Sequence, residues 1–164
     1  MLNKPKFICP LLVVADMQRA RSFYETVLEQ KVIMDFGENI TFEGNFALHL
    51  QSHFAQLIDG KKIDHGANNF EIYFEFDDME AFNQRLLDNG VELVHPMLEQ
   101  PWRQRVVRFY DPDRHIIEVG ESMEHLCYRL HNEEKTIAEI EKITMMPCEF
   151  VKSSVESYSL LDAE

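Results

Sequence analysis

Hydrophobic and polar residues alternate along several short segments of the chain. The clearest alternation is FEIYFEF, residues 70–76, in which apolar residues take every second position and Glu71, Tyr73 and Glu75 stand between them. A period of two predicts a β-strand with one face on a hydrophobic core and the other face on a more polar environment. We therefore expect these three side chains to share the polar face of a sheet.

A helix and three further strands are predicted after this segment. Asp78 is placed as a helix N-cap, apolar residues recur at helical spacing from Met79 to Leu86, and Asn89-Gly90 supplies a C-cap. Apolar runs separated by turn signals, one of which is Asp-Pro-Asp, then predict strands over residues 91–94, 104–110 and 115–120. The predicted order of elements is β-α-β-β-β.

The N-terminal part of the chain shows the same order. A strand is predicted over residues 7–15, and Asp16 caps a helix with an apolar stripe. Three further strands follow, over residues 31–36, 39–43 and 46–51. The helix starts align, ADM at 15–17 against DDM at 77–79, and such a duplication predicts a pseudo-twofold pair of modules. Residues 52–68 join them as a long polar segment, for which we expect a flap or lid.

Superposing the two halves brings four polar residues to equivalent positions. Cys9 falls on Glu71 in the first strands, and His49 falls on Glu118 in the last strands. All four are residue types that bind divalent cations. Because alternation places them on one face of the sheet, we expect Glu118 to point into a concave cleft between the two halves.

At this point the chain resembles the vicinal-oxygen-chelate (VOC) superfamily, over about residues 5–121. Its members include glyoxalase I, extradiol dioxygenases, fosfomycin-resistance enzymes and bleomycin-resistance proteins. The resemblance rests on three segments: VVADMQRARSFYETVL at 13–28, FEFDDMEAFNQRLLDNGVEL at 74–93 and RFYDPDRHIIEVGE at 108–121. The combination is specific for the fold and much less so for one reaction, because one scaffold hosts several chemistries.

The resemblance implies an α+β fold in which two βαβββ modules form curled mixed sheets around a cleft. Module one would span residues 5–51 and module two 69–121, joined by the connector 52–68 within a VOC-like domain of residues 1–121. The remaining residues, 122–164, would form a small helical C-terminal extension. A homodimer is expected, since paired modules in this superfamily commonly associate.

The resemblance also implies a metal site. Glyoxalase-like members hold a divalent ion through the first and last strands of each module, which here gives Cys9, His49, Glu71 and Glu118 as the metal ligands. Glu118 matches the usual last-strand glutamate, whereas the metal-binding members usually carry histidine where Cys9 and Glu71 stand. A thiolate favours zinc, and two carboxylates tolerate manganese or iron. Nickel is also among the metals expected at this site.

Two functions follow from this set. In the first, the protein is a metal-dependent lyase, isomerase or dioxygenase that acts on a small oxygen-bearing molecule by stabilising an enolate or oxyanion, with Glu71 or Glu118 as the catalytic base. In the second, it is a metal-free protein of the bleomycin-resistance type that binds an aromatic or cationic small molecule in an acidic groove. Taken singly, Cys9 is more often a small buried hydrophobe, and Glu71 with its neighbours more often a solvated face.

Trp102, Arg103 and Arg105 form a second candidate cluster. In an acidic chain they have the chemistry to stack on a planar ligand or to pair with its carboxylate, so with Tyr73 and Glu75 they make up the predicted substrate-binding set. The alternative is that both arginines pair with acidic neighbours. His95 and His115 stand at predicted strand ends, and we interpret both as surface or turn residues.

Composition narrows the partners and the compartment. The net charge of −13 disfavours nucleic acids and anionic membranes, and the chain has no run of about 18 apolar residues that would span a bilayer. An odd number of cysteines, at no zinc-finger spacing, fits reduced thiols in the cytoplasm. A small-molecule ligand is therefore the expected partner.

The last forty or so residues carry helical patterns with clear signals. An apolar stripe runs from Met123 to Leu130, Thr136 and Glu139 form a capping box, and Pro147 suits the first turn of a third helix. The spacing resembles a helix-turn-helix, but nine acidic residues stand against four basic ones from 122 to 164. This charge disfavours DNA binding, and we expect a helical cap.

Overall fold

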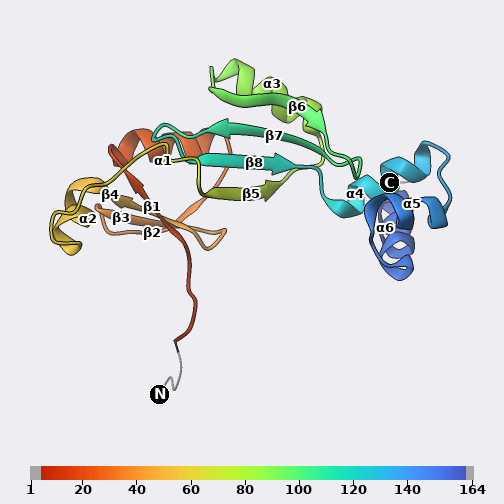
Figure 1. Ribbon diagram of the computed structural model, residues 1–164, viewed down its shortest axis with the longest axis horizontal. Coiled ribbons are helices and arrows are strands. Elements are labelled where there is room, and N and C mark those ends of the chain that lie inside the picture. The colour runs from red at the N-terminus through yellow and green to blue at the C-terminus, as the bar shows by residue number, and fades with distance from the viewer. Residues whose placement is uncertain (1–4, 162–164) are drawn as a thin grey trace. The chain divides into compact units, whose positions relative to one another are not determined.

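The computed structural model describes residues 5–161, which divide into two compact units. The first unit contains the chain up to Phe70 together with Tyr110–Ile116. The second unit contains Glu71–Phe109 and the chain from Ile117 onward. Figure 1 shows the helices and strands of both units along the chain. The α+β class and the repeated β-α-β-β-β order are confirmed.

The first unit is built on a four-stranded sheet in the order β1-β4-β3-β2. Strand β1 runs parallel to β4, and the other neighbours are antiparallel. The strands are β1 (Leu11–Val14), β2 (Val32–Asp35), β3 (Asn39–Phe42) and β4 (Ala47–Leu50). Helix α1 (Met17–Thr26) begins where predicted, because the Asp16 carboxylate accepts a hydrogen bond from the backbone N–H of Arg19.

Tyr24 lies at the centre of the first unit's core. Its ring is fully buried against Phe42 and Phe46, and its hydroxyl donates to Asp111 Oδ2 over 3.0 Å. Burial and the Asp111 carboxylate raise the pKa of Tyr24 well above its usual value. Asp113, in the same Asp-Pro-Asp turn, accepts a hydrogen bond from the backbone N–H of Ala15, so the turn is fixed to the start of α1.

Two expectations for the first unit need correction. The predicted strand over residues 7–15 is shorter, because Pro10 has no N–H to donate and regular pairing begins only at Leu11. The side chains of Phe7 and Ile8 are 81% and 68% exposed. The connector is also less irregular than expected, since it contains helix α2 (Gln51–Leu57).

The second unit repeats the arrangement with the sheet order β5-β8-β7-β6. Its strands are β5 (Glu71–Glu75), β6 (Leu93–Glu99), β7 (Arg105–Tyr110) and β8 (Ile116–Gly120). Residues 91–94 start the predicted strand, and in the structure β6 runs on through Pro96 to Glu99. This is tolerated because β6 is the edge strand of the sheet, where a missing N–H breaks no ladder on the open side.

Helix α3 (Met79–Asp88) covers one face of this sheet. Met79, Phe82 and Leu86 are buried, and Phe82 packs against Phe76 and Phe109. The other face of β5 is polar and exposed, as the alternation predicted. Unit two therefore has a closed hydrophobic face and an open polar face.

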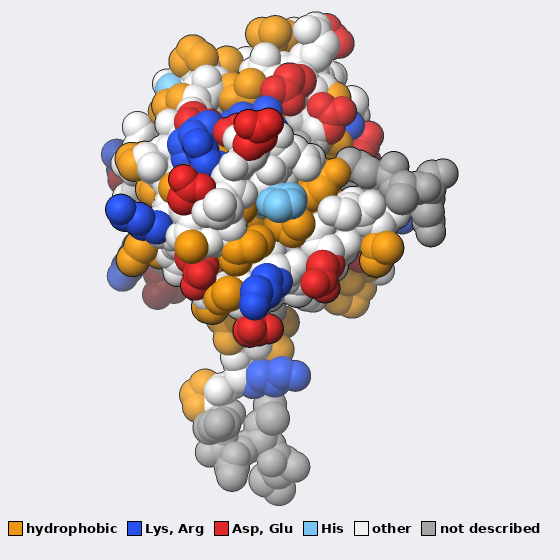
Figure 2. Space-filling view, turned by 90° about the vertical axis from the view of Figure 1, so that its right-hand side faces the viewer, with side chains coloured by type: hydrophobic (Ala, Val, Ile, Leu, Met, Phe, Trp, Pro, Cys, Tyr) orange, Lys and Arg blue, Asp and Glu red, His pale blue; other side chains and the backbone are white. Residues whose placement is uncertain are grey.

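Three helices follow β8: α4 (Met123–Asn132), α5 (Ile137–Thr144) and α6 (Cys148–Leu161). Figure 1 shows them gathered beyond the carboxyl end of β8. The predicted capping box is present, with Thr136 and Glu139 exchanging hydrogen bonds at the start of α5. The helices share a small core of their own, centred on Leu126, Leu130 and Ile140. Figure 2 shows acidic, basic and hydrophobic side chains interspersed on the face that these helices present.

Among the helices of residues 5–161, none is long and apolar enough to cross a bilayer.

Candidate functional site

Arg108 joins two of the predicted site residues on the open face of the second unit's sheet. Arg108 comes from β7, and its Nε lies 3.1 Å from Glu71 Oε2 on β5. One of its terminal nitrogens is in direct contact with Glu118 Oε2 on β8. His95, on β6, places Nε2 3.4 Å from the other terminal nitrogen. A single guanidinium therefore bridges both carboxylates.

The local sequence explains why these groups meet. Residues that alternate along adjacent strands present every second side chain to the same face, and Glu71, Glu118 and Arg108 occupy such positions. Glu118 is only 7% exposed. Burial raises the pKa of the Glu118 carboxyl, and the nearby Arg108 charge partly opposes that rise. A buried carboxylate in the middle of β8 is thus accommodated by a partner on the neighbouring strand.

Tyr73 lies beside this group on β5. Its hydroxyl donates to Glu75 Oε1 over 3.1 Å and accepts from Gln104 Nε2 over 2.9 Å. Burial, followed by the Glu75 charge, raises the pKa of Tyr73 to about 12, so its phenol stays protonated. Trp102 donates its indole N–H to Gln104 Oε1, which ties the ring to the same network.

The two arginines of the predicted substrate-binding cluster are engaged by acidic residues. Arg103 pairs with Glu99 and Glu133. Arg105 pairs with Glu80 and Glu121. These contacts agree with the alternative that the sequence left open for this cluster, and binding of a ligand by Trp102, Arg103 and Arg105 stays a prediction.

Glu121 was not singled out from the sequence, yet it is the most buried carboxylate of the second unit's network. Its side chain is 0% exposed and accepts from Arg129, from His125 and from the backbone N–H of Arg105. These partners outweigh burial and lower the pKa of Glu121 to about 2. The sequence signal was a glutamate directly after an apolar strand, which is not distinctive by itself.

In the first unit, His49 is held in a chain of polar side chains. The His49 ring is 8% exposed, and its Nε2 lies 2.9 Å from Nδ1 of His53. His53 was not singled out from the sequence. His53 in turn faces Glu38 over 3.6 Å, and Asn39 lies 3.5 Å from His49 Nδ1. Burial and the neighbouring His53 lower the pKa of His49. Both of its ring nitrogens are thus engaged.

Cys9 is a half-buried free thiol two residues before β1. It belongs to the first unit with His49, while Glu71 and Glu118 belong to the second. Within each unit's described residues, no three His, Cys, Asp or Glu side chains gather as metal ligands. The four-residue metal site therefore stays a prediction.

The donor groups do not fit a divalent ion as they are arranged within each unit. A metal needs lone pairs that are free to converge. The two carboxylates instead share the permanent charge of Arg108, and the imidazole of His49 is engaged at both nitrogens. His95 and Arg108 are the residues that sequence reasoning missed here. Arg108 stands next to Phe109 in the quoted RFYDPD motif, but nothing in the motif indicates which carboxylates it meets.

Comparisons with known proteins agree with this architecture. The family model of the glyoxalase-like domain matches residues 7–124. A solved structure of a protein of unknown function from Agrobacterium tumefaciens str. C58 is 41% identical; the match covers 74% of this chain and 97% of that chain, with a TM-score of 0.67. No curated protein matches the chain.

Two more distant structures share the fold. A glyoxalase/bleomycin resistance protein/dioxygenase from Nocardioides is 20% identical, with a TM-score of 0.57 over 74% of this chain and 85% of that one. A lactoylglutathione lyase from Agrobacterium tumefaciens is 22% identical, with a TM-score of 0.55 over 73% of this chain and 96% of that one. Residues after 124 lie outside the family match.

Proposed function

Because the chain belongs to the glyoxalase-like family of the VOC superfamily, we propose that it binds a small aromatic cation without a metal ion. The binding surface is the open face of the second unit's sheet. It carries the polar side of β5 and the Arg108 group.

The observation that supports this proposal is the double ion pair of Arg108. A metal ion at Glu71 and Glu118 would have to displace a guanidinium that already pairs with both. Breaking the largely buried pair with Glu118 costs about 3–5 kcal/mol, because one charge is left uncompensated, whereas the exposed pair with Glu71 contributes less. A protein that uses these carboxylates for a metal has little reason to place a permanent cation between them.

The chemistry of the face indicates the ligand. Glu71, Tyr73 and Glu75 take successive outward positions of β5, so an aromatic ring stands between two carboxylates. With Glu118 the face carries three carboxylates, of which Glu71 and Glu118 pair with the Arg108 guanidinium, so the excess charge is negative. A planar cation matches both features, because it stacks on Tyr73 and pairs with the exposed carboxylates.

A second candidate is proton transfer at Glu118. Burial raises the pKa of its carboxyl, and perturbed carboxyls of this kind are found among general acids and bases. The metal-dependent lyase, isomerase or dioxygenase predicted from the sequence, with zinc, manganese, iron or nickel, stays a prediction.

Calorimetric titration with phenyltrimethylammonium tests the proposal. We expect saturable binding to the wild-type protein and binding about tenfold weaker in Tyr73→Ala, since cation–π contacts contribute about 1 kcal/mol or more. Glu75→Gln is expected to weaken binding by removing one carboxylate. Glu149→Gln, at an exposed position of α6, is the matched control and is expected to change nothing.

Benzyl alcohol supplies the neutral comparison for the same titration. Equal binding of the cation and the neutral alcohol would contradict the charge argument. Binding of the cation that survives both Tyr73→Ala and Glu75→Gln would contradict the assignment to this face.

A further inference from the structure

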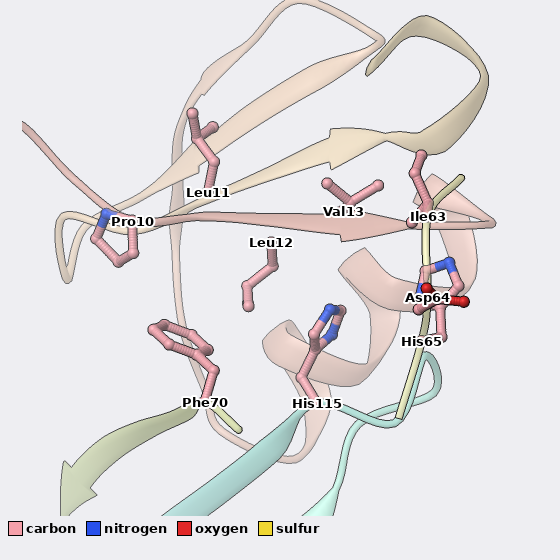
Figure 3. Close-up of a pocket in the computed structure, with 9 residues that line it drawn as sticks. All are labelled: Pro10, Leu11, Leu12, Val13, Ile63, Asp64, His65, Phe70 and His115. Carbon is pink, nitrogen blue, oxygen red and sulfur yellow. The ribbon is translucent and has the colours of Figure 1, made fainter. Parts of the chain in front are cut away.

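The first unit contains a hollow of about 430 Å³ beside its edge strand β1. Its walls include Leu12, Val13, Ile63 and Phe70, with the rings of His65 and His115 facing it. Figure 3 shows the His115 ring between Phe70 and Leu12 on one side and His65 on the other. We call this space the His115 hollow. Its volume and apolar walls are those of a site for a small organic molecule.

His115 is fixed by a buried carboxylate. Asp111 is 3% exposed, and its Oδ2 lies 2.8 Å from His115 Nδ1 while it also accepts the hydroxyl of Tyr24. The other oxygen accepts from the backbone N–H groups of Asp113 and His115. Because Asp111 only accepts, Nδ1 of His115 donates, and Nε2 is left with a lone pair. His115 was expected to be a surface or turn residue, and that expectation did not include its hydrogen bond to the buried Asp111.

His65 presents a lone pair in the same way. Its Nε2 lies 2.6 Å from Gln51 Oε1, which accepts, so Nδ1 is the acceptor nitrogen. The ring centroids of His65 and His115 are 6.1 Å apart. Two imidazoles thus offer acceptors to an apolar space.

The carboxylates near the hollow already have partners within the protein. Asp64 lines the hollow, but its carboxylate pairs with Lys62. Asp111 already accepts four hydrogen bonds. The free acceptor nitrogens and the apolar walls suit a neutral molecule that carries a hydrogen-bond donor on an apolar body. The exposed ring of Phe70 provides an aromatic surface for such a molecule.

We propose that the His115 hollow binds a small phenol whose hydroxyl donates to His115 Nε2. The site stands on the first unit's residues alone and is independent of the aromatic-cation site. The two sites are distinguishable, because phenyltrimethylammonium has no hydrogen-bond donor and a phenol has no positive charge.

Calorimetric titration with 4-methylphenol at about pH 8, where the phenol is neutral, tests this assignment. We expect saturable binding, and binding of 4-methylanisole about tenfold weaker, because the ether cannot donate. His115→Asn keeps an amide donor for Asp111 but removes Nε2, so it is expected to abolish the difference between the two probes. His131→Asn, on the exposed side of α4, is the matched control and leaves the difference intact.

Phe70→Ala provides a second variant that leaves His115 and Asp111 untouched. The Phe70 ring is 50% exposed and lines the hollow beside His115 (Figure 3), so its loss removes the aromatic wall. We expect both probes to bind about tenfold more weakly in this variant while circular dichroism is unchanged. Absence of saturable 4-methylphenol binding to the wild-type protein would overturn the proposal, as would equal binding of phenol and ether or binding that is unchanged in Phe70→Ala.

Discussion

Glu121 shows at the level of one residue how a buried charge stabilises the second unit. Its pKa falls from 4.5 to about 2 in the folded protein, so the folded state resists protonation. The contribution to stability is fully present above pH 4.5 and is lost as pH falls toward 2. We expect Glu121→Gln to lower the free energy of unfolding by about 3 kcal/mol at neutral pH, because Arg129 and Arg105 lose their buried partner.

Urea denaturation at a series of pH values measures this effect. The wild-type and variant curves are expected to converge as the solution becomes more acidic, since protonation of Glu121 removes the same charge. A difference that is constant with pH would contradict the role given to this carboxylate.

The contacts of Arg108 with Glu71 and Glu118 could not be predicted from the sequence. The positions of Glu71 and Glu118 on a polar sheet face follow from alternation, and the structure places both there. Their partner does not follow, because alternation fixes the face of a side chain but not which neighbour a long arginine reaches. His53 was missed for a similar reason, since it lies on a helix in a segment expected to be a loop.

At the scale of elements, local signals predicted helices better than strand ends. The capping residues Asp16 and Asp78 and the Thr136 capping box all lie at helix starts. Strand ends depend on pairing with distant segments, which the sequence does not state; β1 begins at Leu11 and β6 runs on to Glu99. Helix α2 lacks a side-chain cap, so no local signal marked its start.

The Thr136 capping box is expected to stabilise the start of α5. Thr136→Ala removes the hydroxyl that accepts from the backbone N–H of Glu139, and we expect the free energy of unfolding to fall by about 1 kcal/mol. Thr136→Ser keeps the hydroxyl and is expected to retain most of the stability. Thermal denaturation followed by circular dichroism compares them, and equal midpoints for all three proteins would argue against a capping role.

At the scale of the whole molecule, the C-terminal helices are an addition to the glyoxalase-like fold. The family match ends at residue 124, and α4–α6 pack around a small core of their own. They are attached through Glu121 to Arg129, and through Asp77, which accepts hydrogen bonds from Ser122 and Tyr158. The extension is therefore expected to stabilise the second unit without forming its sheet.

Truncation after Glu121 tests this expectation. We expect residues 1–121 to stay soluble and to keep their strand content, because a relative of 41% identity matches over 97% of its length to 74% of this chain. The unfolding midpoint should fall, since Glu121 loses Arg129 and Asp77 loses both hydroxyl donors. Circular dichroism and thermal denaturation measure both quantities, and an unfolded truncated chain would show that the extension is part of the fold itself.

Arg108 pairs with both Glu71 and Glu118, and under the proposed function no metal ion takes its place. Elemental analysis of protein purified without an affinity tag, before and after incubation with zinc, manganese, iron or nickel, tests this. We expect far less than one metal ion per chain in every preparation, for the wild-type protein and for Glu118→Gln alike. One bound metal ion per chain in the wild-type protein, lost in Glu118→Gln and kept in the control Glu149→Gln, would contradict it.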